Sequence, residues 1–232
     1  MDDHRTFDEA WETLPVGARV ALERQWMGLV AGGLPCGASI LDANGAVLAA
    51  GRNHAYDPPG GVETRASDPL QQTRLAHAEL NALALIPTEI DPTRLTLWTT
   101  QHPCVMCAAA VQFIGIGKVC FVADDPSDHA PPEAIVGTRG AVSYEALGDP
   151  LWWTISNMLF LYNSALHQGT DARNMRQNRE RYPALVRLTR EVATHDALGQ
   201  AARAGTGLPA ALLPHAAAIR HAATFALRKA IS

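Results

Sequence analysis

The first half of the chain alternates between short apolar runs and stretches in which apolar residues recur every three or four positions. The short runs are typical of buried strands, and the longer period is typical of helices. Gly32-Gly33 follows the first helical stretch, Asn44-Gly45 fits a tight hairpin turn, and Pro87 stops a later helix. The pattern predicts helices at 16–31, 76–85 and 103–113 and strands at 38–42, 46–50, 95–99 and 118–122.

The order of these elements predicts the fold class. The first two strands are joined by a tight turn and should form a hairpin. The later strands are separated by helices, and this order implies parallel neighbours with covering helices. We therefore expect an α/β fold with a core over residues 1–125. This core should be a three-layer α/β/α sandwich around a mixed central sheet of about five strands.

The second half of the chain has a different character. Residues 126–150 are rich in Pro, Gly and Asp, which indicates loop with at most a short strand or helix. Helical spacing returns at residues 151–166, 183–197 and 208–230. We expect residues 126–232 to form a mainly helical extension packed on the core. The extension could close a pocket, with Trp152 and Trp153 as pocket walls, or it could be structural cover in which both rings are core.

The composition is that expected of an intracellular enzyme. The chain has 232 residues, of which 47% are hydrophobic, and this suffices for one substantial core with an appendage. No apolar run reaches the length of about 18 residues that a membrane span needs. Residues 1–5 lack the apolar centre of a signal peptide, and four Cys do not make a disulfide framework, so we expect a cytoplasmic protein.

Charge gives little reason to expect a nucleic-acid partner. The formal net charge is −4, so there is no global attraction for phosphate backbones. One local basic run consists of Arg173, Arg176, Arg179, Arg181, Arg187 and Arg190. This run could bind phosphate or RNA. We favour the alternative that it is a solvated helix face paired with Asp171, Glu180 and Glu191.

Two short motifs on either side of a predicted strand carry the candidate chemistry. The first is H-A-E at residues 77–79, and the second is P-C-V-M-C at residues 103–107. One His and two Cys can bind a zinc ion and leave its fourth position open. Cys104 and Cys107 are three residues apart, so they lie on one face of the first turn of a helix. The positive end of that helix favours thiolate over thiol.

Glu79 lies two residues after His77. At a helix start, His77 can bind the metal while Glu79 reaches a water without binding metal. A metal-bound water has a pKa of about 7, against about 15.7 in bulk. Glu79 could take a proton from that water and pass it to a departing amine. Together these groups suit the delivery of hydroxide to an amino-substituted ring carbon.

The alternative is a structural zinc, which needs a fourth protein ligand. Cys36, His102 and Cys120 are the candidates by residue type. Cys120 sits in an apolar strand and is interpreted as a small buried hydrophobic residue. Cys36 follows a proline at a strand entrance, which favours a core position. His102 is too close to Cys104 in an extended segment to be an easy ligand, so we favour the catalytic type of site.

The combined pattern H-A-E and P-C-V-M-C resembles the signature of the cytidine deaminase-like superfamily of zinc-dependent nucleobase deaminases. The stretch P-C-V-M-C-A-A-A at residues 103–110 is most similar to the tRNA adenosine deaminase, guanine deaminase and fungal-type cytosine deaminase branch. The resemblance covers about residues 16–125. Relatives often have an acidic residue where this chain has His102, and residues 126–232 align with no branch.

The resemblance implies roles for particular residues. It places zinc on His77, Cys104 and Cys107 and the proton shuttle on Glu79. Asn53, at the end of the first two strands, would hydrogen-bond the substrate ring or sugar. The remaining candidates for substrate contacts are Ala78 at the start of the H-A-E helix and His54 and Tyr56 on the loop after Asn53. The related branches usually form dimers, so the resemblance also implies a homodimer.

The function expected from these observations is zinc-dependent hydrolytic deamination of a purine or pyrimidine base, nucleoside or related small heterocycle, with release of ammonia. The second candidate is tRNA adenosine deamination, against which the acidic net charge and the long apolar tail stand. The third, from another class, is a non-catalytic zinc scaffold that binds partners through the helical tail. A structural zinc needs no unligated carboxylate, so Glu79 argues against the scaffold. Reductive or other ring chemistry on the same fold also stays open.

Overall fold

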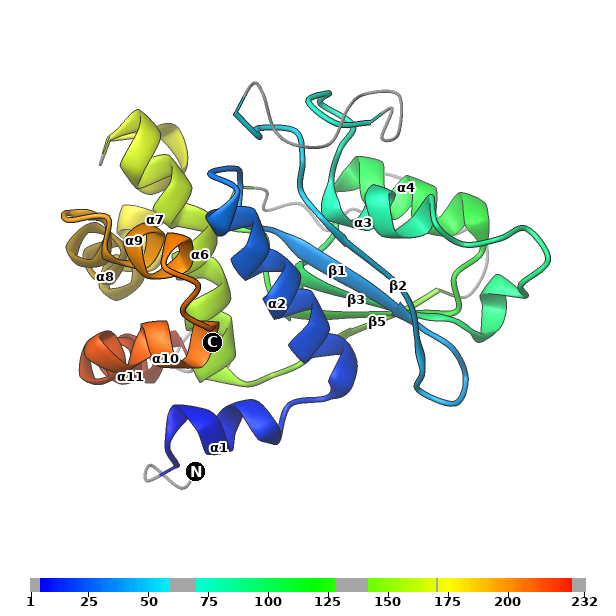
Figure 1. Cartoon of the computed structure of the whole chain (residues 1–232), viewed down its shortest axis with the longest axis horizontal. Helices are drawn as coiled ribbons and strands as arrows, with labels where there is room; N and C mark the ends of the chain where they lie inside the picture. The colour runs from blue at the N-terminus through cyan, green and yellow to red at the C-terminus, as the bar shows by residue number, and fades with distance from the viewer. Residues whose placement is uncertain (1–4, 59–69, 128–141, 170, 227–232) are drawn as a thin grey trace.

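The chain folds around a single mixed β-sheet with helices on both faces (Figure 1). The computed structural model describes residues 5–58, 70–127, 142–169 and 171–226. Within these ranges the strand order is β2-β1-β3-β4-β5. The strands are β1 (Gly37–Leu41), β2 (Val47–Arg52), β3 (Thr96–Gln101), β4 (Lys118–Ala123) and β5 (Ser143–Ala146). β1 runs antiparallel to β2 and β3, whereas β3, β4 and β5 are parallel.

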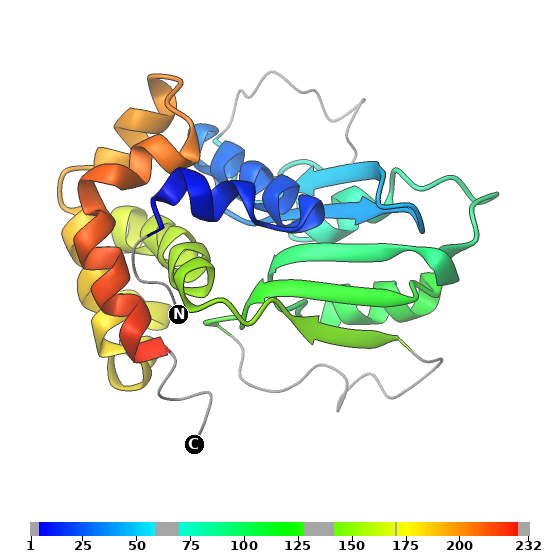
Figure 2. The ribbon, with the colours of Figure 1, turned by 90° about the horizontal axis from the view of Figure 1, so that it is seen from below.

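Helices cover the two faces of the sheet unequally (Figures 1 and 2). The helices are α1 (Phe7–Glu12), α2 (Val16–Val30), α3 (Ala78–Leu83), α4 (Val105–Ile114), α6 (Pro150–Gln168), α7 (Arg173–Arg181), α8 (Pro183–Ala193), α9 (Ala197–Arg203), α10 (Leu208–Leu212) and α11 (Ala216–Ala226), with short 3₁₀ turns at Pro92–Arg94 and Leu213–His215. One hydrophobic cluster joins the sheet to α3 and α4, and another contains α1, α2 and the helices from α6 onward. The predicted α/β/α sandwich is therefore confirmed.

Glycines set how closely two of the helices approach the sheet. A Cβ atom on Gly37 of β1 would lie 2.0 Å from the carbonyl oxygen of Ala21 in α2. A Cβ atom on Gly51 of β2 would lie 2.5 Å from the carbonyl oxygen of Ala78 and 2.7 Å from the backbone nitrogen of Ala82 in α3. These contacts need the bare backbone that only glycine offers. The first turn of α3 is thereby seated directly on the sheet.

Two helical stretches predicted in the extension are each divided into two helices. The stretch 208–230 is expected to be helical, and its residues 227–230 lie outside the described residues; within the rest, α10 ends at Leu212 and α11 begins at Ala216. Pro214 lies in the 3₁₀ turn between them, where its missing N–H prevents a continuous helix. The stretch 183–197 is likewise divided between α8 and α9, with Asp196 in the left-handed region at a φ of 49°.

Three of the six arginines in the basic run of the extension contact Asp171. Arg179 forms an ion pair with the Asp171 carboxylate at 2.6 Å, and Arg190 approaches the same carboxylate at 3.7 Å. Arg176 donates to the Asp171 carbonyl oxygen. These contacts agree with the paired-surface interpretation rather than with a dedicated phosphate site. Among the described residues, no helix combines the length and the apolar character required to cross a membrane.

We expect Gly51→Ala to lower the free energy of unfolding by about 1–3 kcal/mol, because the new Cβ atom must displace the backbone of α3. Chemical denaturation measures the loss. Gly207→Ala is the matched control: an added Cβ atom there meets no atom within 4 Å, and φ is −67°. If the two variants are equally stable, the close approach of α3 to β2 is not the constraint that the structure implies.

Candidate metal centre and active site

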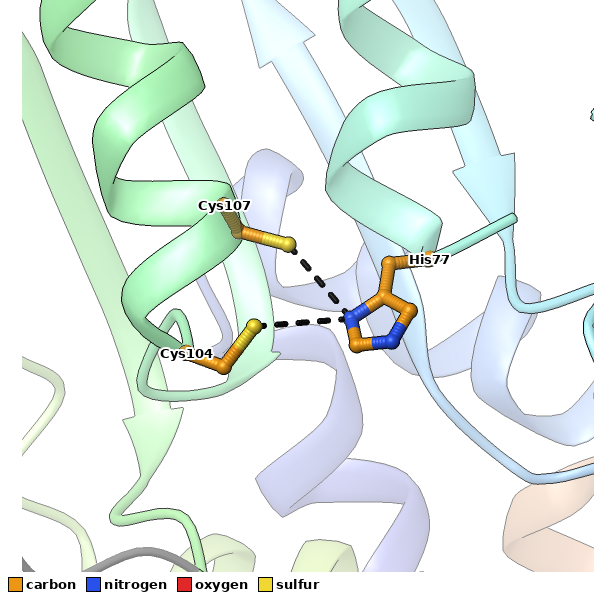
Figure 3. A group of neighbouring side chains, drawn as sticks. All are labelled: His77, Cys104 and Cys107. Carbon is orange, nitrogen blue, oxygen red and sulfur yellow. Dashed lines mark hydrogen bonds between the residues drawn. The ribbon is translucent and has the colours of Figure 1, made fainter. Parts of the chain in front are cut away.

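Two helix N-termini bring the residues of both sequence motifs together (Figure 3). His77 is the N-cap of α3, and Cys104 is the N-cap of α4, with Cys107 one turn further on. The Nδ1 atom of His77 lies 3.6 Å from the Cys104 sulfur and 3.5 Å from the Cys107 sulfur. The potential ligand atoms of the three residues all lie within 4.8 Å of one another.

This geometry fits a zinc ion. Tetrahedral coordination with a Zn–S distance of about 2.3 Å and a Zn–N distance of about 2.0 Å separates the nitrogen and sulfur ligands by about 3.5 Å. The observed nitrogen–sulfur distances are 3.5 and 3.6 Å. Among the described residues, the group of potential ligands contains these three side chains and no fourth. Three protein ligands with one open position are typical of a catalytic zinc rather than a structural one.

The candidates for a fourth ligand are placed elsewhere. The ring of His102 packs edge-on against Phe121 at 4.5 Å and stacks on Tyr144 at 5.5 Å. These contacts hold His102, two residues before the N-cap of α4, against β4 and β5. Cys120 is buried in β4. Cys36 lies near the site but outside the group of potential ligands.

The side chains of His77, Cys104 and Cys107 shift one another's pKa values. Hydrogen bonds from Cys107 and His77 lower the pKa of Cys104 to about 4, despite its burial. The hydrogen bond with Cys104 and burial together raise the pKa of Cys107 well above its ordinary value. The hydrogen bond with Cys104 also raises the pKa of His77. Because zinc needs deprotonated ligands, its binding releases protons, and zinc affinity should weaken as pH falls.

Glu79 lies beside the ligands in a buried position. It is 7% exposed, and burial is the main cause that raises its pKa. Its Oε1 accepts a hydrogen bond from the Thr99 hydroxyl of β3 at 3.2 Å, and its Oε2 accepts one from the Cys107 thiol at 3.4 Å. A fixed carboxyl with a raised pKa is suited to take up and release a proton near neutral pH.

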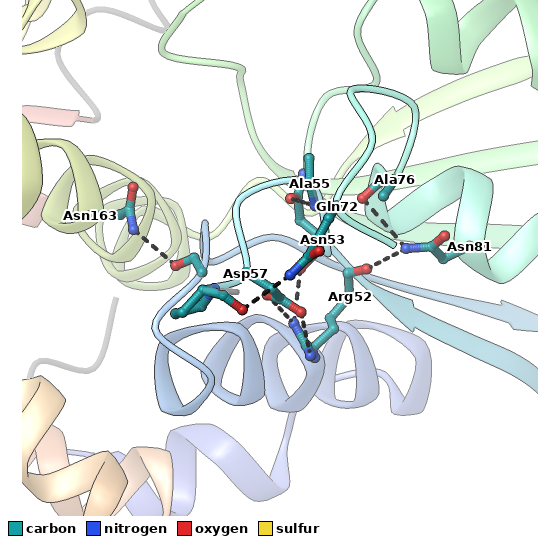
Figure 4. Close-up of polar contacts among 10 residues, drawn as sticks. Arg52, Asn53, Ala55, Asp57, Gln72, Ala76, Asn81 and Asn163 are labelled. Carbon is teal, nitrogen blue, oxygen red and sulfur yellow. Dashed lines mark hydrogen bonds and ion pairs between the residues drawn. The ribbon is translucent and has the colours of Figure 1, made fainter. Parts of the chain in front are cut away.

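Asn53 follows β2 on a loop that is held from several directions (Figure 4). Its backbone N–H donates to the Cys36 carbonyl at 3.0 Å, and its side-chain Oδ1 accepts from the Ala55 N–H at 2.9 Å. Arg52 forms a two-point ion pair with Asp57 at 2.7 and 2.8 Å and also donates to the Asn53 carbonyl. The side chain of Asn53 is therefore fixed in orientation before any ligand binds.

Asn81 connects this loop to the His77 helix. Its Nδ2 donates to the Arg52 carbonyl at 2.8 Å and to the Ala76 carbonyl at 3.4 Å. The backbone N–H of His54 donates to the same Ala76 carbonyl at 2.9 Å. The segments that carry Asn53 and His77 are thus held as one unit.

The other predicted substrate contacts differ in their surroundings. Ala78 is buried in the first turn of α3, and Tyr56 is 64% exposed. Trp152 is 1% exposed, and its ring packs on Trp11 at 5.6 Å, so it offers no surface to a substrate. On helix α6, Trp152 therefore faces the core formed by the helices. This placement agrees with the alternative in which the extension is structural cover. Trp153 lines a cavity of about 200 Å³ between α6 and the ends of β4 and β5.

Near the zinc ligands, the sequence analysis gave no role to Thr99 or Asp125, and it considered Cys36 only as a core residue or a fourth zinc ligand. Thr99 bonds Glu79 from the adjacent strand. Cys36 is a buried thiol, and burial followed by the charge of Glu79 raises its pKa well above the ordinary value. Asp125 carries one of the charges that act on both His77 and Cys36. Asp125 could have been identified from the sequence, because Asp124-Asp125 follows the predicted strand 118–122 that comes after the Cys motif.

The site combines three potential zinc ligands with a buried carboxyl group outside the ligand group. This combination is typical of a catalytic zinc site. The profile of the family described as "Cytidine and deoxycytidylate deaminase zinc-binding region" matches residues 16–123. This match confirms the predicted resemblance of the segment to the cytidine deaminase-like superfamily. A comparison with curated proteins gives no match.

Solved structures of deaminases are similar to part of the chain. A tRNA:A34 deaminase is 24% identical, with a TM-score of 0.43, over 55% of this chain and 93% of that chain. A guanine deaminase from Nitrosomonas europaea is 21% identical, with a TM-score of 0.46, over 62% of this chain and 81% of that chain. A dCMP deaminase from the cyanophage S-TIM5 is 24% identical, with a TM-score of 0.35, over 49% and 80%.

Cys104→Ala and Cys107→Ala should each lose zinc, because each removes one of three ligands. Elemental analysis of purified protein should find about one zinc per wild-type chain and far less in either variant. Zinc should raise the melting temperature of the wild type and of the control below, but of neither ligand variant. Cys120→Ala is the matched control, since Cys120 is a buried thiol outside the ligand group and its loss should leave the zinc content unchanged. Equal zinc in all four proteins would refute the assignment.

Proposed function

We propose that the protein is a zinc-dependent hydrolytic deaminase of a purine or pyrimidine base, nucleoside or related small heterocycle. The observation that carries the proposal is the buried Glu79 carboxyl, fixed by Thr99 beside His77, Cys104 and Cys107 but outside the ligand group. A scaffold that used zinc only for structure would have no need of this carboxyl. When bound, a zinc ion lowers the pKa of a coordinating water, which supplies the nucleophile.

Glu79 would move the protons of the reaction. It accepts a proton from the attacking water and delivers it to the departing amino group, so that ammonia leaves and the ring carbon gains an oxo group. The C–N bond breaks with its electron pair on nitrogen, and the net reaction consumes one water. Thr99 keeps the carboxyl pointed at the ligand group through the bond to Oε1.

Asn53 would orient the ring. Its Oδ1 is held by the Ala55 N–H, so the NH₂ end of the amide is the end that can donate to a ring nitrogen or carbonyl. Backbone N–H groups at the starts of α3 and α4 would support negative charge that develops on the ring. Ala78, the first residue of α3, supplies such an N–H at the site. The Asp125 carboxylate can accept a hydrogen bond from a ring N–H or a sugar hydroxyl.

A small heterocycle is favoured over tRNA as the substrate. The formal net charge is −4. Within the basic run of the extension, Arg179 and Arg190 form ion pairs with Asp171. Both features reduce the attraction for a phosphate backbone. We also propose a homodimer. α4 has no charged residue and leaves Phe113 92% exposed, so two copies could meet there without bringing like charges of α4 into contact.

Glu79→Gln should keep zinc and fold and should lower the deamination rate by about 10²- to 10⁴-fold, because the amide cannot accept the proton. Ammonia release measures the rate, and elemental analysis verifies the metal. Glu89→Gln, the same change at an exposed position, is the control and should behave as wild type. Turnover close to normal in the Glu79 variant would exclude Glu79 as the proton shuttle.

The substrate class can be tested by comparing small molecules with tRNA. We expect ammonia release from at least one free base, nucleoside or nucleotide, with little dependence on salt. A tRNA editor would instead bind tRNA with an affinity that falls steeply as salt rises, because each phosphate contact releases counterions. Tight, salt-sensitive tRNA binding with no turnover of any small heterocycle would reverse the ranking.

A further inference from the structure

The loop of residues 124–127 follows β4 at the edge of the sheet where the zinc ligands lie. The backbone N–H of His102 donates to the Ala123 carbonyl at 2.7 Å, so β3 and β4 end side by side. Cys104 and Asp125 each lie two residues beyond this bond. The charge of Asp125 also acts on His77, where it adds to the larger effect of the hydrogen bond with Cys104. The Asp125 carboxylate is thus within electrostatic reach of the ligand group.

Asn178 of α7 binds this loop from the helical extension. Its side chain is 0% exposed, and its Nδ2 donates to the Pro126 carbonyl at 2.8 Å and to the Asn174 carbonyl at 2.8 Å. The first bond joins residues 52 positions apart in the chain. A buried amide that bonds a loop carbonyl fixes that loop, since loss of the donor would leave a buried acceptor unsatisfied.

Trp153 of α6 binds the same loop from a second direction. Its Nε1–H donates to Asp124 Oδ2 at 3.4 Å, and its ring packs edge-on against Tyr182 at 4.8 Å. Within the loop, the Ser127 N–H donates to Asp125 Oδ1 at 2.7 Å. The orientation of the Asp125 carboxylate therefore follows the position of the loop backbone.

On the side of the extension, Pro126 is buried against Asn178 of α7, whereas Asp124 is exposed beside a cavity. Asp124, Trp153 and Tyr182 line the cavity of about 200 Å³ that separates α6 and α8 from the end of β4. Next to this cavity, Asp124 lacks the dense contacts that hold a core residue in place. The bonds from Asn178 and Trp153 therefore carry much of the positioning.

We propose that Asn178 and Trp153 are positioning residues of the active site, which hold the 124–127 loop so that the Asp125 carboxylate stays beside the zinc ligands and can bind a substrate N–H or O–H group. The helical extension then contributes to substrate binding without touching the substrate. The kinetic part of this inference rests on the proposed deaminase function, whereas the structural part does not.

Two substitutions remove the bonds with little change of shape. Asn178→Leu removes the donor to Pro126, and Trp153→Phe removes the donor to Asp124 while it keeps an aromatic ring against Tyr182. Trp152→Phe is the matched control, because the same change at the neighbouring residue affects the core and not the loop. Zinc content and melting temperature are measured for each variant.

Amide hydrogen exchange tests the structural part. Exchange across residues 124–127 should rise about tenfold in Asn178→Leu and in Trp153→Phe, with or without zinc, and should stay at the wild-type rate in Trp152→Phe. Unchanged exchange in both loop variants would overturn the proposal even if their melting temperatures fall. This outcome is independent of whether the protein deaminates anything.

Kinetics on a substrate found by the ammonia assay test the functional part. Both variants should raise KM about 3- to 10-fold while kcat stays within about twofold, since the loop serves binding and not the proton transfer. In a double-mutant cycle, Asn178→Leu should have almost no further effect on KM once Asp125 is replaced by Asn. Additive effects would show that Asn178 acts elsewhere and would refute its role through Asp125.

Discussion

The site depends on two helix starts being held against one edge of the sheet. His77 caps α3 and Cys104 caps α4, so the three zinc-type ligands meet only if both helices are seated correctly. The bare backbone of Gly51 lets α3 approach β2, and the amide of Asn81 joins the start of α3 to the end of β2. Glu79 shares this first turn, so the constraint that assembles the ligands also places the carboxyl that we propose as the proton carrier.

The helical extension packs on the same sheet that holds the two helix starts. α6 packs against β3 and β4, and it shares a hydrophobic cluster with α1 and α2. Its first turn carries Trp152, which is buried in that cluster, and Trp153, which faces the loop after β4. One helix therefore combines structural cover with contact to a loop at the site.

Local chemistry explains why much of the fold and site could be predicted from the sequence. The strands are short apolar runs with Gly and Pro at their ends, and the ligand motifs lie at predicted helix starts. Thr99, Asn178 and the placement of Trp152 could not be predicted. Their roles depend on which side chains from distant segments meet, and periodicity does not encode such pairs. Asp125 could have been predicted in part. The order of the strands places it near the Cys motif, but its contacts do not follow from the sequence.

The central claim is that His77, Cys104 and Cys107 bind zinc and leave one position for water. X-ray absorption at the zinc edge of the wild-type protein tests it most directly. The account requires two sulfur ligands at about 2.3 Å, one imidazole nitrogen at about 2.0 Å and one further light atom from solvent. A third sulfur, or a second imidazole in the fourth position, would show a closed structural site and would contradict the account.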